Sequence, residues 1–296
     1  MTINRRRAPS SAISSAKKKG GHKNEGIYAS LIQGEVIKGT QKGDVKDQLD
    51  FQYSVKSQKK WQIFLYSHDR IASSKYLKIL KPSLEAFPID SEIYFRDRVR
   101  CIEFKEAYVR KHGREEAKKL TNQEVIEAIG ENVYVKSKTN LAHATSEVSR
   151  ILTDKTFLRN FLAEALFAID EVSYLAILDT TFKRDNIFKT FDREDVLDIL
   201  SENLIPGTSK AGHAPEDFNV SGQKTLLRYT LGESTDKNIV EIEIRNDSDT
   251  KYRLVRFNMY SKDALFLLTE KLGDKMPMSP KNGLQYFGRA KRISEK

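Results

Sequence analysis

The sequence predicts an α/β protein built around a mixed β-sheet, with an α+β arrangement as the alternative. Residues 172–179 (VSYLAILD) form a continuous apolar run, which is typical of a buried central strand. Residues 91–169 carry apolar side chains at helical spacing and contain few Gly or Pro residues. Helices and strands alternate without a regular βαβ order, which favours a mixed sheet over a purely parallel one.

The other elements follow from local patterns. In the first part of the chain we expect a helix at 24–33 that Gly34 ends, strands at 35–38 and 52–57, and a helix at 59–80. Thr121 and Glu124 have the spacing of a capping box, which predicts a helix start. In the last part we expect a helix at 192–204, a loop at 205–222, strands at 225–231, 239–245 and 252–260, and a helix at 262–272.

Composition and charge limit the classes of protein to which the chain can belong. The chain has 296 residues and a net charge of +10, which favours a polyanionic partner such as nucleic acid. Its single cysteine, Cys101, excludes a disulfide within the chain and fits a cytoplasmic location. No apolar run is long enough for a membrane helix, so no membrane association is expected. Residues 1–21 read as a basic flexible tail and 22–296 as one domain with a helical block at about 91–170.

One short stretch, residues 21–61, carries the chemistry. Glu25 lies on the predicted first helix, Asp44 follows Gly43 at a strand end, and Lys56 lies near the end of the next strand. Carboxylates bind hard cations such as Mg²⁺ through oxygen. The cation activates water and neutralises charge on a phosphate, while a lysine supplies a fixed positive charge. Two converging carboxylates and a lysine therefore predict a metal-dependent phosphodiesterase.

The order of helix glutamate, Gly-Asp-Val and a strand with Ser-Val-Lys resembles the PD-(D/E)XK nuclease superfamily, over about 40 of the 296 residues. More narrowly it is similar to type II restriction endonucleases and archaeal Holliday-junction resolvases, and the chain length is closer to the former. The resemblance implies a central sheet of restriction-endonuclease-like type flanked by helices. It also implies Mg²⁺ bound by Glu25 and Asp44, with Lys56 orienting or activating water.

Two positions depart from the family pattern. Gly43 stands where the family often has proline, and Ser54 stands where most members have Asp or Glu. A serine hydroxyl is a poor Mg²⁺ ligand, so the site loses one anionic donor. Ser54 is therefore the site residue that decides between two alternatives. Either the active site is a variant in which Glu25 completes the metal ligands, or the site is inactive. We favour activity because Glu25, Asp44 and Lys56 all remain.

Several polar side chains are candidates for DNA binding, with a solvated basic surface as the alternative explanation. They flank the motif or lie in predicted recognition elements at about 180–260: Lys38, Gln41, Lys42, Ser57, Lys59, Lys60, Lys183, Arg184 and Asn186.

The expected function is Mg²⁺-dependent, site-specific cleavage of double-stranded DNA that leaves 5′-phosphates. Because one site addresses one strand at a time, we expect a homodimer or a pair with a second subunit. The resemblance also implies a cognate DNA methyltransferase as a genetic partner. The alternatives are a noncatalytic DNA-binding protein on the same fold, which Ser54 supports, and a structure-specific repair or recombination nuclease.

Overall fold

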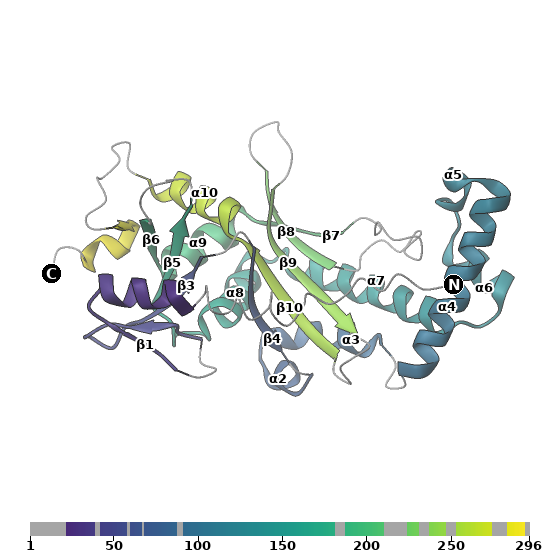
Figure 1. Ribbon diagram of the computed structural model, residues 1–296, viewed down its shortest axis with the longest axis horizontal. Helices are drawn as coiled ribbons and strands as arrows, with labels where there is room; N and C mark the ends of the chain where they lie inside the picture. The colour runs from purple at the N-terminus through teal and green to yellow at the C-terminus, as the bar shows by residue number, and fades with distance from the viewer. Residues whose placement is uncertain are drawn as a thin grey trace. The chain divides into compact units, whose positions relative to one another are not determined.

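A computed structural model shows an α/β protein, as predicted (Figure 1). It describes residues 22–38, 42–57, 60–66, 68–87, 91–180, 187–209, 224–230, 237–246, 253–273 and 283–293. The chain forms two compact units. Unit 1 contains Met1–Trp61, Leu166–Ile199 and Ser261–Lys296, and unit 2 contains Gln62–Ala165 and Leu200–Tyr260. The predicted basic tail lies outside the described residues.

Unit 1 is built on a mixed six-stranded sheet. The strand order is β1 (Glu35–Val36), β2 (Val45–Lys46), β3 (Gln52–Lys56), β5 (Tyr174–Asp179), β6 (Ile187–Asp192) and β11 (Leu284–Phe287). The pairs β3–β5 and β6–β11 are parallel, and the other neighbours are antiparallel. The prediction of a central strand at 172–179 is confirmed, since β5 has a neighbour on each side. β6 and β11 were not predicted.

One face of this sheet packs against the first helix in an apolar cluster. The first helix, residues 22–31, places Tyr28 in one apolar cluster with Tyr53, Val55 and Phe188. The Tyr28 ring lies 5.1 Å from the Phe188 ring, and its hydroxyl is 2.9 Å from the hydroxyl of Thr190. Burial raises the pKa of Tyr28 well above its ordinary value, so the phenol stays neutral in this core.

The first helix ends where it meets the β1–β2 hairpin. Gln33 takes a positive φ of 56°, and the Gly34 N–H donates to the Ala29 carbonyl at 2.8 Å. A Cβ atom added to Gly34 would lie 2.3 Å from the backbone carbonyl oxygen of Lys46. Only glycine therefore permits this approach of helix end and strand.

The turn between β2 and β3 is held by Asp47. One oxygen of its carboxylate accepts from the backbone N–H groups of Leu49 (2.9 Å) and Phe51 (3.0 Å). The other accepts from the hydroxyl of Tyr53 at 2.8 Å. Asp50 closes the turn in the left-handed region, with φ of 64°. The resulting register pairs Val45 with Tyr53.

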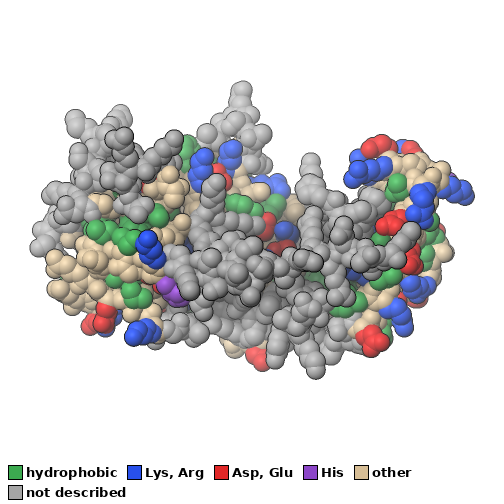
Figure 2. All heavy atoms as spheres, viewed as in Figure 1, with side chains coloured by type: hydrophobic (Ala, Val, Ile, Leu, Met, Phe, Trp, Pro, Cys, Tyr) green, Lys and Arg blue, Asp and Glu red, His purple; other side chains and the backbone are tan. Residues whose placement is uncertain are grey.

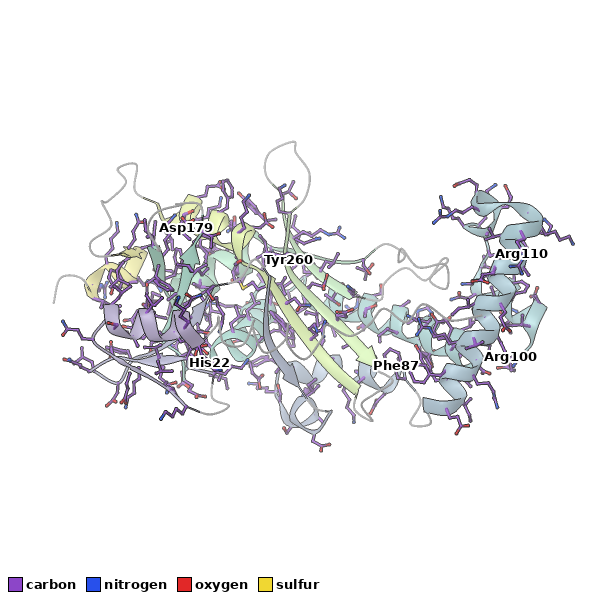
Figure 3. All side chains as sticks on the ribbon, in the orientation of Figure 1. His22, Phe87, Arg100, Arg110, Asp179 and Tyr260 are labelled. Carbon is purple, nitrogen blue, oxygen red and sulfur yellow. The ribbon has the colours of Figure 1, made fainter. Side chains whose placement is uncertain are left out.

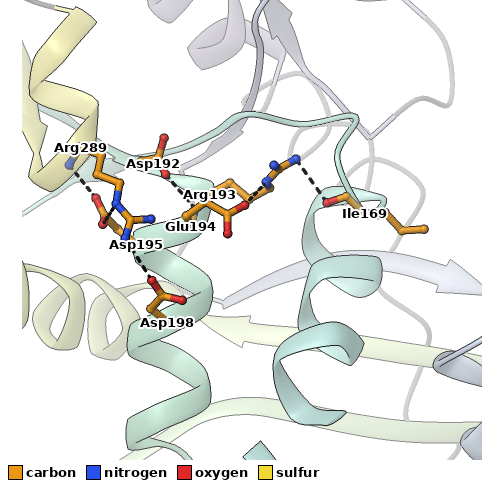
Figure 4. A network of polar contacts seen from close by, with 7 residues as sticks. All are labelled: Ile169, Asp192, Arg193, Glu194, Asp195, Asp198 and Arg289. Atoms are coloured by element: carbon orange, nitrogen blue, oxygen red, sulfur yellow. Dashed lines mark hydrogen bonds and ion pairs between the residues drawn. The ribbon is translucent and has the colours of Figure 1, made fainter. Parts of the chain in front are cut away.

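A polar network joins helix α9 (Arg193–Asn203) to the 3₁₀ segment η3 (Gly288–Ile293) in unit 1 (Figure 4). The Asp195 carboxylate accepts from the backbone N–H of Arg289 at 2.7 Å and pairs with its guanidinium at 3.3 Å. Burial raises the pKa of Asp195, whereas Arg289 opposes this rise. The network fixes the segment that follows β11 against the N-terminal part of α9.

Unit 2 combines an antiparallel sheet with a helical region (Figure 1). The sheet order is β4 (Lys60–Tyr66), β10 (Arg253–Tyr260), β9 (Lys237–Asn246), β8 (Lys224–Tyr229) and β7 (Ile205–Thr208). The helices are α2 (His68–Ser73), η1 (Leu77–Leu80), α3 (Lys81–Glu85), α4 (Ser91–His112), α5 (Arg114–Ala117), α6 (Asn122–Ile129), α7 (Val133–Ile151) and α8 (Lys155–Phe167). Helix α7 packs against β7 and β8. α10 (Ser261–Leu272) belongs to unit 1 and packs against β5.

The helical region contains the predicted capping box, because Thr121 and Glu124 exchange both hydrogen bonds at the start of α6. The Arg100 side chain on α4, labelled in Figure 3, donates to the Ile129 carbonyl at 2.7 Å. Basic and acidic side chains are interspersed over α4, α5 and α6 on the face that Figure 2 shows. This face of the helical region therefore lacks a surface of a single charge among the described residues.

Two sequence predictions in this part of the chain are wrong. Residues 60–66 form strand β4 rather than the start of a helix, and helix α2 begins only at His68. Residues 205–208 were expected to lie in a loop, but they pair with β8 and form strand β7. The late strands are present, and they belong to the second, antiparallel sheet. Among the residues that the structure describes, no helix is both long and apolar enough to cross a membrane.

The approach of Gly34 to Lys46 can be tested with a matched pair of glycines. We expect Gly34→Ala to lower the free energy of unfolding by about 1–3 kcal/mol, because the methyl group collides with backbone that cannot rotate away. Gly26 lies on the first helix with no atom within 4 Å of an added Cβ, so Gly26→Ala should stabilise by about 0.5–1 kcal/mol. Urea unfolding followed by circular dichroism measures both. Equal stabilities of the two variants would contradict the close approach.

Candidate active site

Asp44 is fixed by backbone hydrogen bonds to both neighbouring strands. Its N–H donates to the Tyr53 carbonyl at 2.8 Å, and its carbonyl accepts from the Ile37 N–H at 3.0 Å. The β2 ladder begins at the next residue, Val45, which pairs with Tyr53. Its side chain is thus held in place by the register that Asp47 sets.

One oxygen of the Asp44 carboxylate gathers three donors. Oδ2 accepts from the backbone N–H of Val55 at 2.7 Å and from Lys56 Nζ at 2.7 Å. The Ser54 hydroxyl is a longer third donor at 3.4 Å. The side chains of Asp44 and Lys56 are 22% and 16% exposed, so the ion pair is partly shielded yet open to a ligand. Partial shielding strengthens the field of both charges relative to full exposure in water.

Side chains alternate along β3, so the site residues and the residues that pack against the first helix lie on opposite faces of the strand. Gln52, Ser54 and Lys56 point to one face of the sheet, and Tyr53 and Val55 point to the other, where the first helix packs. The Asp44 carboxylate reaches this face of β3, since it contacts the Ser54 hydroxyl and Lys56 Nζ. The structure therefore brings three of the predicted residues together: Asp44, Ser54 and Lys56.

The fourth predicted residue, Glu25, has its contact within the first helix. It lies on the first helix with its side chain 17% exposed, and it pairs with His22 Nδ1 at 2.9 Å, one turn away (Figure 3 labels His22). Within the described part of the chain, Glu25 makes no hydrogen bond or ion pair with Asp44 or Lys56. The same residues contain no group of three or more His, Cys, Asp or Glu placed to hold a metal ion.

Gly43 and Gln52 pack tightly beside Asp44. A Cβ atom on residue 43 would lie 2.1 Å from Gln52 Oε1 and 3.1 Å from Gln52 Cβ. A side chain at position 43 would therefore displace the Gln52 amide. Gln52 Oε1 is buried and has no hydrogen-bond partner among the described residues. Sequence reasoning missed Gln52, although its spacing two residues before Ser54 places it on the site face of β3.

The donor chemistry at Asp44 fits Mg²⁺ in one respect. Mg²⁺ commonly retains several waters and is held by one or two carboxylates together with substrate phosphate oxygens. Asp44 supplies one such carboxylate, partly exposed and at the edge of a rigid sheet. Among the described residues, Asp44 belongs to no group of three or more His, Cys, Asp or Glu that could hold a metal ion.

The predicted DNA-binding residues fall into two groups. Lys38 is exposed, and Lys42 and Ser57 are partly exposed on the segments beside Asp44 and Lys56. Lys60 begins β4, and its side chain is outside the described part. The remaining candidates also lie outside the described residues: Gln41, Lys59, Lys183, Arg184 and Asn186.

A second ion pair lies further along the same sheet face. Lys189 Nζ on β6 contacts Asp179 Oδ2 on β5 at 2.8 Å, and Figure 3 labels Asp179. Lys56, Ile177 and Lys189 stand in one row across β3, β5 and β6. The sequence signal for this pair was the acidic end of the apolar run 172–179, but β6 was not predicted.

Comparisons of the chain with protein-family models, with curated proteins and with solved structures found no match. Conclusions about function therefore depend on the residues and their geometry.

The two members of the ion pair should differ in their effect on stability. Asp44→Ala leaves the Val55 N–H without its acceptor, so we expect a loss of about 1–3 kcal/mol in the free energy of unfolding. Lys56→Met keeps the apolar stem and leaves the Asp44–Val55 hydrogen bond intact, so its cost should stay below about 1 kcal/mol. Urea denaturation at constant ionic strength measures both changes. A larger cost for Lys56→Met would show that Asp44 does not hold the strand end.

Proposed function

We propose that this protein is a Mg²⁺-dependent DNA endonuclease of the PD-(D/E)XK type, acting at specific sites as type II restriction enzymes do. The observation that carries the proposal is the Lys56–Asp44 contact at 2.7 Å, with both groups partly shielded on the polar face of β3. The surroundings agree with this. The order of the first helix, the three antiparallel strands and a parallel neighbour of β3 suits the sheet that the sequence resemblance implies.

Each residue has a defined task in the proposal. Asp44 would bind the cation through its carboxylate, with waters and a phosphate oxygen completing the coordination. Bound Mg²⁺ would supply a more acidic water and charge neutralisation at the phosphate. Lys56, held by Asp44 and the strand end, keeps a positive charge fixed at the position where the anionic phosphate arrives. A role for Glu25 as a metal ligand stays a prediction from the sequence.

Double-stranded DNA is the proposed substrate. A net charge of +10 favours a polyanion, and Lys38 and Lys42 lie on the segments next to Asp44. Cutting both strands requires two sites, which the proposal assigns to a homodimer or to a second subunit. A cognate methyltransferase and a cytoplasmic location belong to the same proposal.

A noncatalytic DNA-binding protein on the same fold is the second candidate. Two observations favour it: Ser54 stands where an acid is usual, and the described residues hold no cluster of three metal-binding side chains. Divalent-metal-dependent cleavage separates the two candidates, because only the first cuts DNA. A repair or recombination nuclease would cut junctions or damaged DNA instead of giving discrete fragments from a plasmid.

Cleavage of a mixed-sequence plasmid tests the proposal. We expect discrete fragments with Mg²⁺ and none with EDTA. Asp44→Asn and Lys56→Met should each reduce the cleavage rate at least about 100-fold, because each removes charge at the reacting phosphate. Asn at position 44 can still accept the Val55 N–H, so folding should persist. DNA binding in EDTA, measured by gel shift, should be retained by both variants.

Lys46 gives a matched control on the same hairpin. Its ion pairs are with Asp50 at 2.8 Å and with Glu35 at 3.4 Å rather than with Asp44. Lys46→Met removes the same charge as Lys56→Met and should cleave within about threefold of the parent, since surface pairs of this kind contribute little. Full activity of Asp44→Asn would refute the site assignment, and binding without any cleavage by the parent protein would favour the second candidate.

A further inference from the structure

The buried carbonyl oxygen of Gln52 is the least explained polar atom at the site. A buried acceptor without a donor destabilises the folded state relative to one that is paired. Gln52 Oε1 is buried and has no partner among the described residues, although the Gln52 main-chain carbonyl accepts from the Ser173 N–H at 2.9 Å. An apolar side chain of similar size would avoid this cost at no loss of packing.

The packing around Gln52 holds this oxygen in place. Its amide lies against Gly43, where any side chain would come within 2.1 Å of Oε1. Gly43 is the residue before Asp44, so the amide lies directly beside the backbone that carries the site carboxylate. The glycine therefore has a specific effect: it makes room for the Gln52 amide.

Gln52 also lies on the correct side of the sheet. It is two residues before Ser54 and four before Lys56 on β3, so all three side chains point to the same face of the strand. The Asp44 carboxylate contacts two of them, the Ser54 hydroxyl and Lys56 Nζ. Ser54 is 4% exposed and offers only a hydroxyl, 3.4 Å from Asp44 Oδ2. The strand thus lacks an acid at position 54 but carries an unpaired oxygen one side chain away on the same face.

We propose that Gln52 Oε1 is the second protein oxygen of the metal site, replacing the acid that Ser54 lacks. Side-chain amide carbonyls are oxygen donors that hard divalent cations accept. A cation bound between Asp44 and Gln52 would satisfy the buried oxygen. The site would then carry one negative protein ligand instead of two. This inference rests on the proposed function, since it names a further ligand of the same site.

The test is Mn²⁺ binding to the full chain, measured by the paramagnetic resonance of the free ion. Gln52→Leu removes the oxygen and keeps the volume, so we expect a loss of at least tenfold in Mn²⁺ affinity with no loss of thermal stability. Gln52→Glu supplies an acid at the same position, so its Mn²⁺ affinity should rise above that of the parent. Gly43→Ala, which displaces the amide, should weaken Mn²⁺ binding in the same direction as Gln52→Leu.

Gln48, exposed on the β2–β3 turn, is the matched control. Gln48→Leu and Gln48→Glu should bind Mn²⁺ as the parent does, which separates a local ligand from a general effect of charge. Unchanged Mn²⁺ affinity in Gln52→Leu would overturn the inference, as would a Gln52→Glu variant that binds no better than the parent.

The two proposals fail in different ways. If Asp44→Asn loses Mn²⁺ while Gln52→Leu retains it, the metal site stands and the role of Gln52 is wrong. If the parent binds no Mn²⁺, or if Asp44→Asn binds it equally well, the proposed metal-dependent function fails as well. Should Gln52→Leu fold poorly, Gln52→Glu and Gly43→Ala still decide the question, because the ligand role predicts opposite changes for them.

Discussion

The register of the β2–β3 hairpin is the constraint on which the candidate site depends. Asp47 fixes it by accepting from two turn N–H groups and from the Tyr53 hydroxyl. A slip of one residue would move every side chain of β3 to the opposite face. Tyr53 and Val55 would then leave the core of unit 1, and Lys56 would lose Asp44. Core packing and site geometry are therefore selected by the same pairing, and neither can shift without the other.

The site contains few charged groups. One carboxylate oxygen receives a lysine, a main-chain N–H and a serine hydroxyl, so removal of Asp44 affects the strand end as well as the ion pair. Gly43 and Gln52 complete this region without adding charge. A metal-binding role for these residues would rely on neutral oxygens more than is usual for Mg²⁺, and the phosphate of the substrate would supply much of the negative charge around the cation.

Local patterns in the sequence predict much of this arrangement. The helix before Gly34, the strand around Lys56, the apolar run of β5 and the capping box of α6 are all encoded within a few residues, and the structure contains each of them. β4 was mistaken for helix because its pairing with β10 comes from distant residues. Glu25 illustrates a related limit. Its position on a helix could be predicted, but in the structure its carboxylate pairs with His22 of the same helix and not with a residue of the sheet. Gln52 was missed because the sequence does not reveal that its side-chain oxygen is buried.

The parallel pairing of β3 with β5 has a consequence for how the protein is made. These two strands are adjacent in space, yet the whole helical region from α2 to α8 lies between them in the chain, and β11 joins the same sheet only near residue 287. Contacts of such long sequence separation pay a large loop-closure entropy and fold slowly. During synthesis the site hairpin emerges first but must wait for β5, β6 and β11 before its sheet is complete. A fragment that ends after the motif would carry Asp44 and Lys56 without the strand that supports them.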